Sequence, residues 1–201
     1  MGIPSYFSHI IRTYSNIIRS FKELSCTQFG TLFMDCNSII YDAVHTIPYN
    51  HNEPDDYESQ IIDSVIKSIS NYLSIIKPTN TIFIAFDGVA PFAKMEQQRT
   101  RRNRTAITKK ILSQTEDRQW DTSVITPGTN FMTNLSKRVQ HAFENMEQKY
   151  KVSKIIVSGS GSPGEGEHKL FDYLREQHCL NENIALYGLD SDLIMLSIFN
   201  L

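Results

Sequence analysis

The chain has 201 residues, 40% of them hydrophobic, and a formal net charge of −2. This length and apolar content suit one globular domain over residues 1–201 with a sizeable core. The charge balance excludes a chain-wide basic surface for nucleic acid, and no apolar run approaches the roughly 20 residues that a membrane span needs. Cys26, Cys36 and Cys179 form no CxxC pair and indicate reduced thiols in an intracellular protein.

The first half of the chain alternates short apolar runs with helical patterns. It predicts a short helix over Pro4–Tyr14, a buried strand over Phe29–Met34, a short helix that Asn37 caps, and a loop over His45–Asp56. Apolar residues at helical spacing then make Tyr57–Ile76 the clearest amphipathic helix. A strand over Ile82–Phe86 follows, and a turn through Gly88 and Pro91 leads into a basic helical stretch.

The second half continues this alternation. It predicts a loop over Asp117–Gly128, one long amphipathic helix from Phe131 to Tyr150, a strand over Ile155–Val157, a helix through Leu174, and a last strand over Ile184–Tyr187. Because strands alternate with helices, we expect an α/β fold with a mainly parallel central sheet flanked by helices.

Acidic residues recur at one place in this predicted sheet. At, or just past, the C-terminal ends of the four strands come Asp35, Asp87, Glu165, Glu167, Asp190 and Asp192. Open parallel sheets bind their ligands at that edge. Carboxylates gathered there repel one another unless cations neutralise them, and hard oxygen ligands suit Mg²⁺ or Mn²⁺. A single aspartate after a strand is usually a helix cap, but four such strand ends predict a metal site for one or two ions.

A basic stretch follows the second strand. Seven lysines and arginines lie between Lys94 and Lys110, with Glu96 as the only acid. On a helix at about 100° per residue, an arc of about 100° holds Lys94, Gln98, Arg101 and Arg102. Most charge runs are solvated helix faces, but such repulsion is usually kept for an anionic partner. We therefore expect a phosphate pocket beside the metal site.

The glycine-rich segment after the third strand allows other interpretations. Gly159–Gly164 fits the GxGxxG pattern of dinucleotide-binding proteins, but the two glutamates that follow would put negative charge where the pyrophosphate must lie, so we reject that function. Glu165 and Glu167 would diverge by roughly 160° on a regular helix, so both can face one cluster only if the glycines bend the chain. Ser162 and Glu165 also fit a capping box, which leaves a structural role open for Glu165.

Together these motifs resemble those of the XRN family of 5′→3′ exoribonucleases. The matching pieces cover most of the chain: MGIPSYF, LFMDCNSIIY, IFIAFDGVAPFAKMEQQRTRR, ITPGTNFM, IIVSGSGSPGEGEHK and LYGLDSDLIML. The resemblance implies a PIN/5′-nuclease-like, Rossmann-like core and catalysis by two Mg²⁺ or Mn²⁺ ions that the six acids hold. It also implies that the four-residue polar face binds the 5′-monophosphate of a single-stranded RNA, which is hydrolysed to mononucleotides.

The chain departs from the family pattern at a few positions. Tyr41 stands where the family has a histidine that stacks on the first base, and a tyrosine ring can also stack. Phe92 replaces a usual arginine near the phosphate pocket. The resemblance further implies a seventh metal-binding acid and a second conserved region beyond Leu201. We therefore expect a domain truncated before them, which a further protein segment completes.

Two rival functions remain open. One is a structure-specific 5′ nuclease for DNA flaps, from the same broad superfamily, and the other is a catalytically incomplete RNA-binding module. The Gln97–Arg99 stretch and the PGEGEH motif favour the exoribonuclease over the flap nuclease. For the exoribonuclease we expect an intracellular protein with no membrane partner, and the cytoplasm is favoured over the nucleus.

Overall fold

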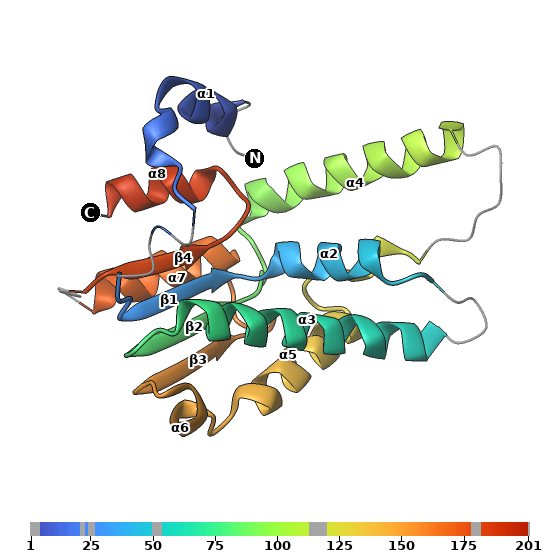
Figure 1. The fold of residues 1–201 in the computed structure, drawn as a ribbon. Helices are drawn as coiled ribbons and strands as arrows, with labels where there is room; N and C mark the ends of the chain where they lie inside the picture. Colours follow the sequence, from blue (N-terminus) through green and yellow to red (C-terminus); the bar gives the residue numbers. More distant parts are fainter. Residues whose placement is uncertain are drawn as a thin grey trace.

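The computed structural model describes residues 5–20, 23, 27–49, 54–112, 120–177 and 182–200. The side chains of residues 54, 55, 101, 102, 105, 106 and 108–112 lie outside this description. At the centre is a four-stranded, all-parallel sheet with the strand order β3-β2-β1-β4 (Figure 1). Its strands are Thr31–Asp35 (β1), Thr81–Ala85 (β2), Lys154–Ser158 (β3) and Ile184–Tyr187 (β4). The predicted α/β fold with a parallel sheet is therefore confirmed.

The helices of the described residues lie between and beyond these strands. Their bounds are Tyr6–Thr13 (α1), Asn37–Thr46 (α2), Pro54–Ile76 (α3), Phe92–Leu112 (α4), Asn130–Phe143 (α5), Glu147–Tyr150 (α6), Gly166–Glu176 (α7) and Asp192–Phe199 (α8). Short 3₁₀ turns lie at Ser15–Ile17 (η1) and Thr122–Val124 (η3). Within this described part of the chain, no helix is long and apolar enough to cross a membrane.

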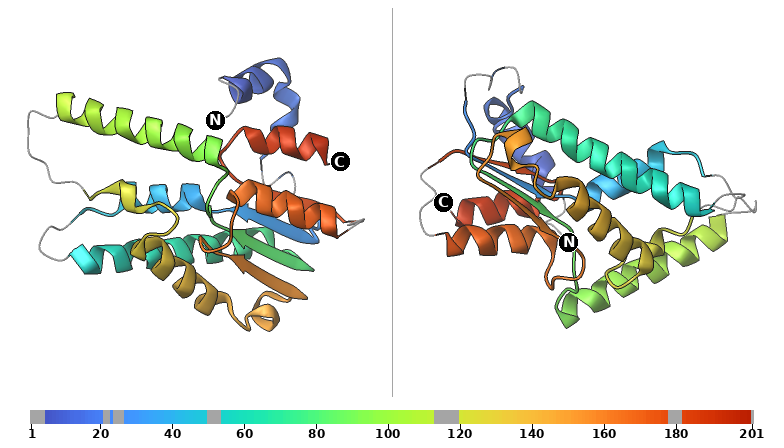
Figure 2. Two further views of the ribbon diagram at one scale, coloured as in Figure 1. Left: turned by 180° about the vertical axis from the view of Figure 1, so that it is seen from behind. Right: turned by 90° about the horizontal axis from the view of Figure 1, so that it is seen from below.

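The inner strands β1 and β2 are buried on both faces, because successive side chains of a strand point to opposite sides, whereas the edge strands β3 and β4 are only partly buried. Helices α3 and α5 cover one face, and α2 packs on α3 beyond the carboxyl ends of the strands, while α7 covers the other face with α8 beside it (Figures 1 and 2). Met34 and Ile84 belong to the core on the α3 and α5 side of the sheet, and Phe33 and Phe83 pack against Leu170 of α7 on the other side. This two-sided burial fixes the strand ends that carry the acidic residues.

An aromatic cluster next to η3 completes the core on the α3 and α5 side of the sheet. Trp120, to which the sequence assigns no role, is buried between Tyr57 of α3 and Phe131 of α5, with ring centroids 5.7 and 5.2 Å away. The Tyr57 hydroxyl donates to the carbonyls of Val44 and Ile47 at the end of α2. Trp120 is therefore a core residue that packs between α3 and α5.

Three local predictions were wrong. The loop expected over 45–56 is shorter, because α2 continues to Thr46 and α3 begins at Pro54. The long helix expected from 131 to 150 breaks into α5 and α6, since Glu144 is extended and Asn145 has a φ of 57°. Asn37 is the first residue of α2 rather than its cap, and its side-chain oxygen accepts a bond from the Asp87 amide at 3.2 Å.

Candidate active site and metal centre

The parallel register aligns the carboxyl ends of the strands at one edge of the sheet. Asp35 is the last residue of β1 and pairs with Ala85 of β2, which in turn pairs with Ser158 of β3. Asp87 lies two residues beyond Ala85, and the Asn37 side chain holds its backbone amide. The first two predicted acids therefore lie on adjacent strands at the edge where the sequence places the site.

The loops after β2 and β3 are joined backbone to backbone. The Gly88 amide donates to the Gly164 carbonyl at 2.8 Å, and the Gly164 amide donates to the Val89 carbonyl at 2.9 Å. A Cβ on Gly88 would lie 1.7 Å from the Ser162 carbonyl oxygen, so only glycine permits this approach. The β2 loop, which carries Asp87, is thereby tied to the segment that leads into α7.

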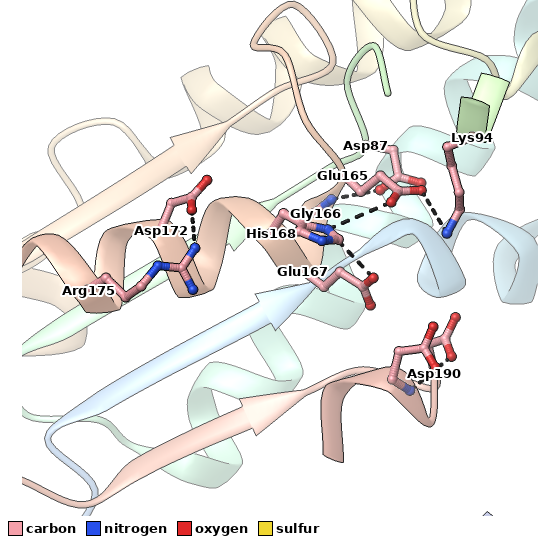
Figure 3. Close-up of polar contacts among 10 residues, drawn as sticks. Asp87, Lys94, Glu165, Gly166, Glu167, His168, Asp172, Arg175 and Asp190 are labelled. Carbon is pink, nitrogen blue, oxygen red and sulfur yellow. Dashed lines mark hydrogen bonds and ion pairs between the residues drawn. The ribbon is translucent and has the colours of Figure 1, made fainter. Parts of the chain in front are cut away.

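The glycines bend the chain at the start of α7, as the sequence analysis required. Gly164 has a φ of 97° and Glu165 is extended, so α7 begins at Gly166. Glu165, Glu167 and His168 then each offer one ligand atom, and these atoms all lie within 4.8 Å of one another (Figure 3). The two glutamates therefore share one side despite their spacing of two residues.

The start of α7 also contacts both strand-end aspartates. The Gly166 amide donates to Asp87 Oδ1 at 2.7 Å, and a Cβ on Gly166 would lie 2.6 Å from Asp35 Oδ1. The alternative of a capping box from Ser162 and Glu165 is excluded, because Glu165 occupies the N-cap position and its side chain makes no capping bond. The Glu165 carboxylate instead meets Lys94 Nζ at 3.3 Å.

Asp190 and Asp192 follow β4 and face this group from the far side of β1. Asp190 Oδ1 accepts a bond from the Asp192 amide at 3.2 Å, which fixes the turn into α8. In Figure 3 Asp190 lies across from Glu167, with its carboxylate toward the other acids. A Cβ on Gly188 would lie 2.1 Å from Leu193 Cδ1 and 3.5 Å from Asp35 Cβ, so glycine permits this tight turn.

The acids form one electrostatic cluster. Burial, followed by the charge of Asp87, raises the pKa of Asp35 from 3.8 to about 7. Burial, followed by the charges of Asp190 and Asp35, raises the pKa of Glu167 from 4.5 to about 7. Burial also raises the pKa of Asp87, although the Gly166 amide opposes the shift. Burial disfavours the charged form of each carboxylate, and the neighbouring negative charges add to the shift.

A cavity of about 840 Å³ opens onto these acids. Its polar lining residues include Asp35, Asp87, Asp190, Asn37 and Gln98. Its apolar and aromatic lining residues include Phe7, Tyr41, Ile125, Met132, Leu189 and Ile194. Tyr41, which the resemblance assigns to base stacking, therefore lines the same cavity as the acids.

The donor set fits a hard divalent cation. Asp35 Oδ1 is buried and has no hydrogen-bond partner among the described residues, although a buried carboxylate oxygen normally has one. The surrounding groups are carboxylates, the oxygen ligands that Mg²⁺ and Mn²⁺ prefer. The cluster could therefore hold a metal ion, whose positive charge would offset the repulsion between the neighbouring carboxylates.

Two residues of the predicted phosphate pocket face the protein. On α4, among side chains the structure describes, only Lys94 and Gln98 are partly buried and the rest are exposed. Their spacing of four residues puts both on one side of the helix, the side on which Lys94 meets Glu165. The helix backbone continues through positions 101 and 102, but the side chains of Arg101 and Arg102 lie outside the described residues.

Sequence reasoning missed two functional candidates in the PGEGEHK motif. His168 lies between Glu165 and Glu167, with its Nδ1 at 3.7 Å from a carboxylate oxygen of each. Lys169 is buried and its Nζ donates to the carbonyls of Phe86 and Gly159, at 2.8 and 2.9 Å. Burial lowers the pKa of Lys169 to about 8, although the charge of Asp87 opposes this. The sequence feature that could have revealed Lys169 is its position on the apolar side of α7, next to Leu170.

Comparisons with known proteins agree with the motifs. The family model described as "XRN 5'-3' exonuclease N-terminus" matches residues 1–200. The chain is 34% identical to 5′-3′ exoribonuclease 1 of Saccharomyces cerevisiae, over 98% of this chain and 14% of that protein. It is 36% identical to 5′-3′ exoribonuclease 1 of Homo sapiens, over 98% of this chain and 12% of that protein. For the 5′-3′ exoribonuclease 2 homolog of Drosophila melanogaster the identity is 32%, over 98% of this chain and 27% of that protein. The chain thus spans about a quarter or less of these relatives.

Proposed function

Because the chain belongs to the XRN 5′-3′ exonuclease family, we propose that it supplies the catalytic end of a 5′→3′ exoribonuclease that acts on 5′-monophosphorylated RNA. The observation that supports this proposal most strongly is that the acid cluster and the basic helix α4 are in direct contact. The acids of all four strand ends gather at one edge of the sheet, and Lys94 joins the basic helix α4 directly to Glu165 at 3.3 Å.

We assign the six acids of the sequence analysis to the binding of two divalent cations, Mg²⁺ or Mn²⁺. Bound ions of this kind activate a water for in-line attack on a phosphodiester and stabilise the leaving oxygen. Asp35 and Asp87 are positioned from the strand ends, Glu165 and Glu167 from the start of α7, and Asp190 and Asp192 from the turn before α8. Glu167 is buried and Asp35 and Asp87 are partly buried, and the reduced contact with water strengthens the charge interactions on that side of the site.

The basic face of α4 would hold the 5′-phosphate. Lys94 and Gln98 face the acids from one side of the helix, and the helical spacing continues that side to Arg101 and Arg102. A terminal phosphate gripped there would leave the first phosphodiester over the carboxylates, so each cycle would release one mononucleotide. Arginine forks bind phosphate oxygens in pairs and favour a terminal monophosphate, whereas a hydroxyl end offers them nothing.

The apolar and aromatic residues that line the cavity suit the first nucleobase. Tyr41 is 39% exposed and lines the cavity together with Asp35 and Asp87. An aromatic ring at that place can stack on a base of any identity, which gives binding without sequence preference. The substrate is therefore proposed to be single-stranded, because a paired base could not reach the ring.

The deciding experiment measures binding of one short RNA with a 5′-monophosphate or a 5′-hydroxyl, in Ca²⁺ so that cleavage does not interfere. We expect the wild type to prefer the monophosphate, and Arg101→Ala to lose at least about tenfold in affinity for that form only, since a charge-assisted hydrogen bond contributes about 1.5–3 kcal/mol. Equal weakening of both forms would identify Arg101 as an ordinary surface charge.

A second experiment replaces Ca²⁺ by Mg²⁺ and follows the products. Release of mononucleotides from the monophosphorylated RNA, and not from the hydroxyl form, is the expected result when the following region of a longer relative is added, and release by this chain alone should be weak or absent. Preferential cleavage of a DNA flap would favour the structure-specific nuclease instead. Phosphate-dependent binding without release, both in this chain alone and when the following region of a longer relative is added, would indicate a binding module.

A further inference from the structure

His168 stands inside the acid cluster although the six-acid assignment does not include it. Its Nδ1 lies 3.7 Å from Glu165 Oε2 and 3.7 Å from Glu167 Oε1 (Figure 3). Two donors that each lie about 2.1 Å from one ion are about 3.0–3.4 Å apart in octahedral or tetrahedral coordination. A small side-chain movement would therefore allow these three groups to share one ion.

The rest of the cluster offers only oxygen. Asp35, Asp87 and Asp190 line the cavity, and their side chains are carboxylates. His168 is 53% exposed, whereas Glu165 and Glu167 are 12% and 10% exposed, so the imidazole closes the cluster on its solvent side. Among the described residues, the group of Glu165, Glu167 and His168 alone brings three candidate ligand atoms within 4.8 Å. The cluster therefore contains two chemically different parts.

The two parts should prefer different ions. Carboxylate oxygens suit Mg²⁺ and Mn²⁺, whereas an imidazole nitrogen suits the later first-row ions and raises affinity along the series from Mn²⁺ to Cu²⁺. We propose that Glu165, Glu167 and His168 form a subsite for a late first-row divalent ion of the Fe²⁺ or Co²⁺ class, beside an oxygen-only subsite for Mg²⁺. This inference rests on the metal centre of the proposed function and adds a nitrogen ligand and an ion preference to it.

The alternative role for His168 is that of a counter-charge to the two glutamates. A protonated imidazole between Glu165 and Glu167 would compete with a metal ion, so removing it would leave cation affinity unchanged or increase it. If His168 is a ligand, its removal should instead lower the cation affinity, because the loss of a nitrogen donor weakens the binding of a late first-row ion. The direction of the change therefore separates the two roles.

A matched control lies on α5. His141 has the same spacing to an acid, with its Nδ1 3.9 Å from Glu144 Oε2, but it is 90% exposed and meets only this one glutamate. Replacing His141 by Gln removes an imidazole next to a carboxylate without touching the cluster. Any effect that His141→Gln shares with His168→Gln would come from the loss of a surface histidine.

The experiment uses protein purified without a histidine tag and titrates Co²⁺ and Mg²⁺ separately by calorimetry. We expect His168→Gln to weaken Co²⁺ binding by about tenfold or more and Mg²⁺ binding by less than about threefold, as expected for the loss of a nitrogen ligand. His141→Gln should match the wild type for both ions. Unchanged or stronger Co²⁺ binding by His168→Gln would overturn the proposal in favour of the counter-charge.

A second readout reports the ligand directly. Co²⁺-loaded wild type and His141→Gln should show a strongly shifted, exchangeable imidazole N–H signal in the proton NMR spectrum, and His168→Gln should lack it. Absence of that signal in wild type that binds Co²⁺ would overturn the subsite and leave the metal centre intact. If neither Co²⁺ nor Mg²⁺ binds the wild type, the metal centre of the proposed function fails as well.

Discussion

The acidic edge and the basic helix α4 differ in how the fold supports them. The acids follow the strands of the sheet, of which β1 and β2 are buried, and backbone bonds from Gly166 and between the paired loops position Asp87 and the segment before α7. Helix α4 leaves the sheet and extends past its edge, and its described side chains are exposed apart from Lys94 and Gln98 (Figures 1 and 2). The groups proposed for chemistry are thus fixed by the core, while those proposed for substrate binding lie on a helix that the core hardly constrains.

This difference has an energetic consequence. Acids crowded in a buried place destabilise the ion-free fold, so their substitution should change stability and metal binding together. Exposed residues of a solvated helix contribute little to stability, so their substitution should change RNA binding alone. Melting temperature and RNA affinity measured on the same variants therefore test whether the two regions are independent.

The largest effect is expected for Asp87→Asn. The amide keeps an oxygen that can accept the bond from the Gly166 backbone, but it removes the charge that adds to the raised pKa of Asp35. Mutating a group that only hydrogen-bonds to a metal ligand typically lowers metal affinity by ~10–100-fold. Asp87→Asn changes a proposed ligand itself, so the metal affinity should fall by more than that. Mononucleotide release should fall with it, while the ion-free melting temperature stays the same or rises. A lower ion-free melting temperature would show that Asp87 is structural.

The next effect concerns α4. Lys94→Met removes the ion pair with Glu165 and one proposed phosphate ligand, so binding of monophosphorylated RNA should weaken by at least about tenfold, the equivalent of one charge-assisted hydrogen bond. Arg99→Met on the same helix is the matched control, since Arg99 is 76% exposed and its nearest acid is Glu96 at 3.9 Å. Equal losses in the two variants would mean that α4 acts only through its overall charge.

The sequence reached these two regions by different routes. The acids were found because parallel strands end at one edge, a property that buried apolar runs reveal directly. The helical face was found from the 3.6-residue period, and the partial burial of Lys94 and Gln98 agrees with it. The sequence did not reveal the contacts of Asn37, His168 and Lys169, because these contacts are made with backbone groups and side chains that are distant in sequence or brought together by the fold. The helix break between α5 and α6 was missed because apolar residues continue at helical spacing on both sides of Asn145, whose φ is positive.

The pH dependence of stability should separate the two regions again. The folded-state pKa values of Asp35 and Glu167 lie near 7, above their ordinary values of 3.8 and 4.5. A raised acid pKa gives stability that is fully present below the ordinary value and lost as pH rises through the folded value. The ion-free melting temperature should therefore fall between pH 5.5 and 8, by roughly 2–4 °C for each kcal/mol lost. Mg²⁺ at pH 8 should restore it, and a rise across this range without metal would contradict the crowding of the acids.

The smallest effect is expected for Arg99→Ala. Arg99 and Glu96 are both exposed at a separation of 3.9 Å, a geometry in which an ion pair contributes little because water screens it. The free energy of unfolding should change by no more than about 0.5 kcal/mol, with or without Mg²⁺, since surface substitutions away from buried contacts rarely exceed that. Chemical denaturation at two Mg²⁺ concentrations measures both values with the same protein. A change larger than this, or one that depends on Mg²⁺, would couple the outer side of α4 to the acid cluster. The two regions would then form one energetic unit, although only Lys94 joins them in the described contacts.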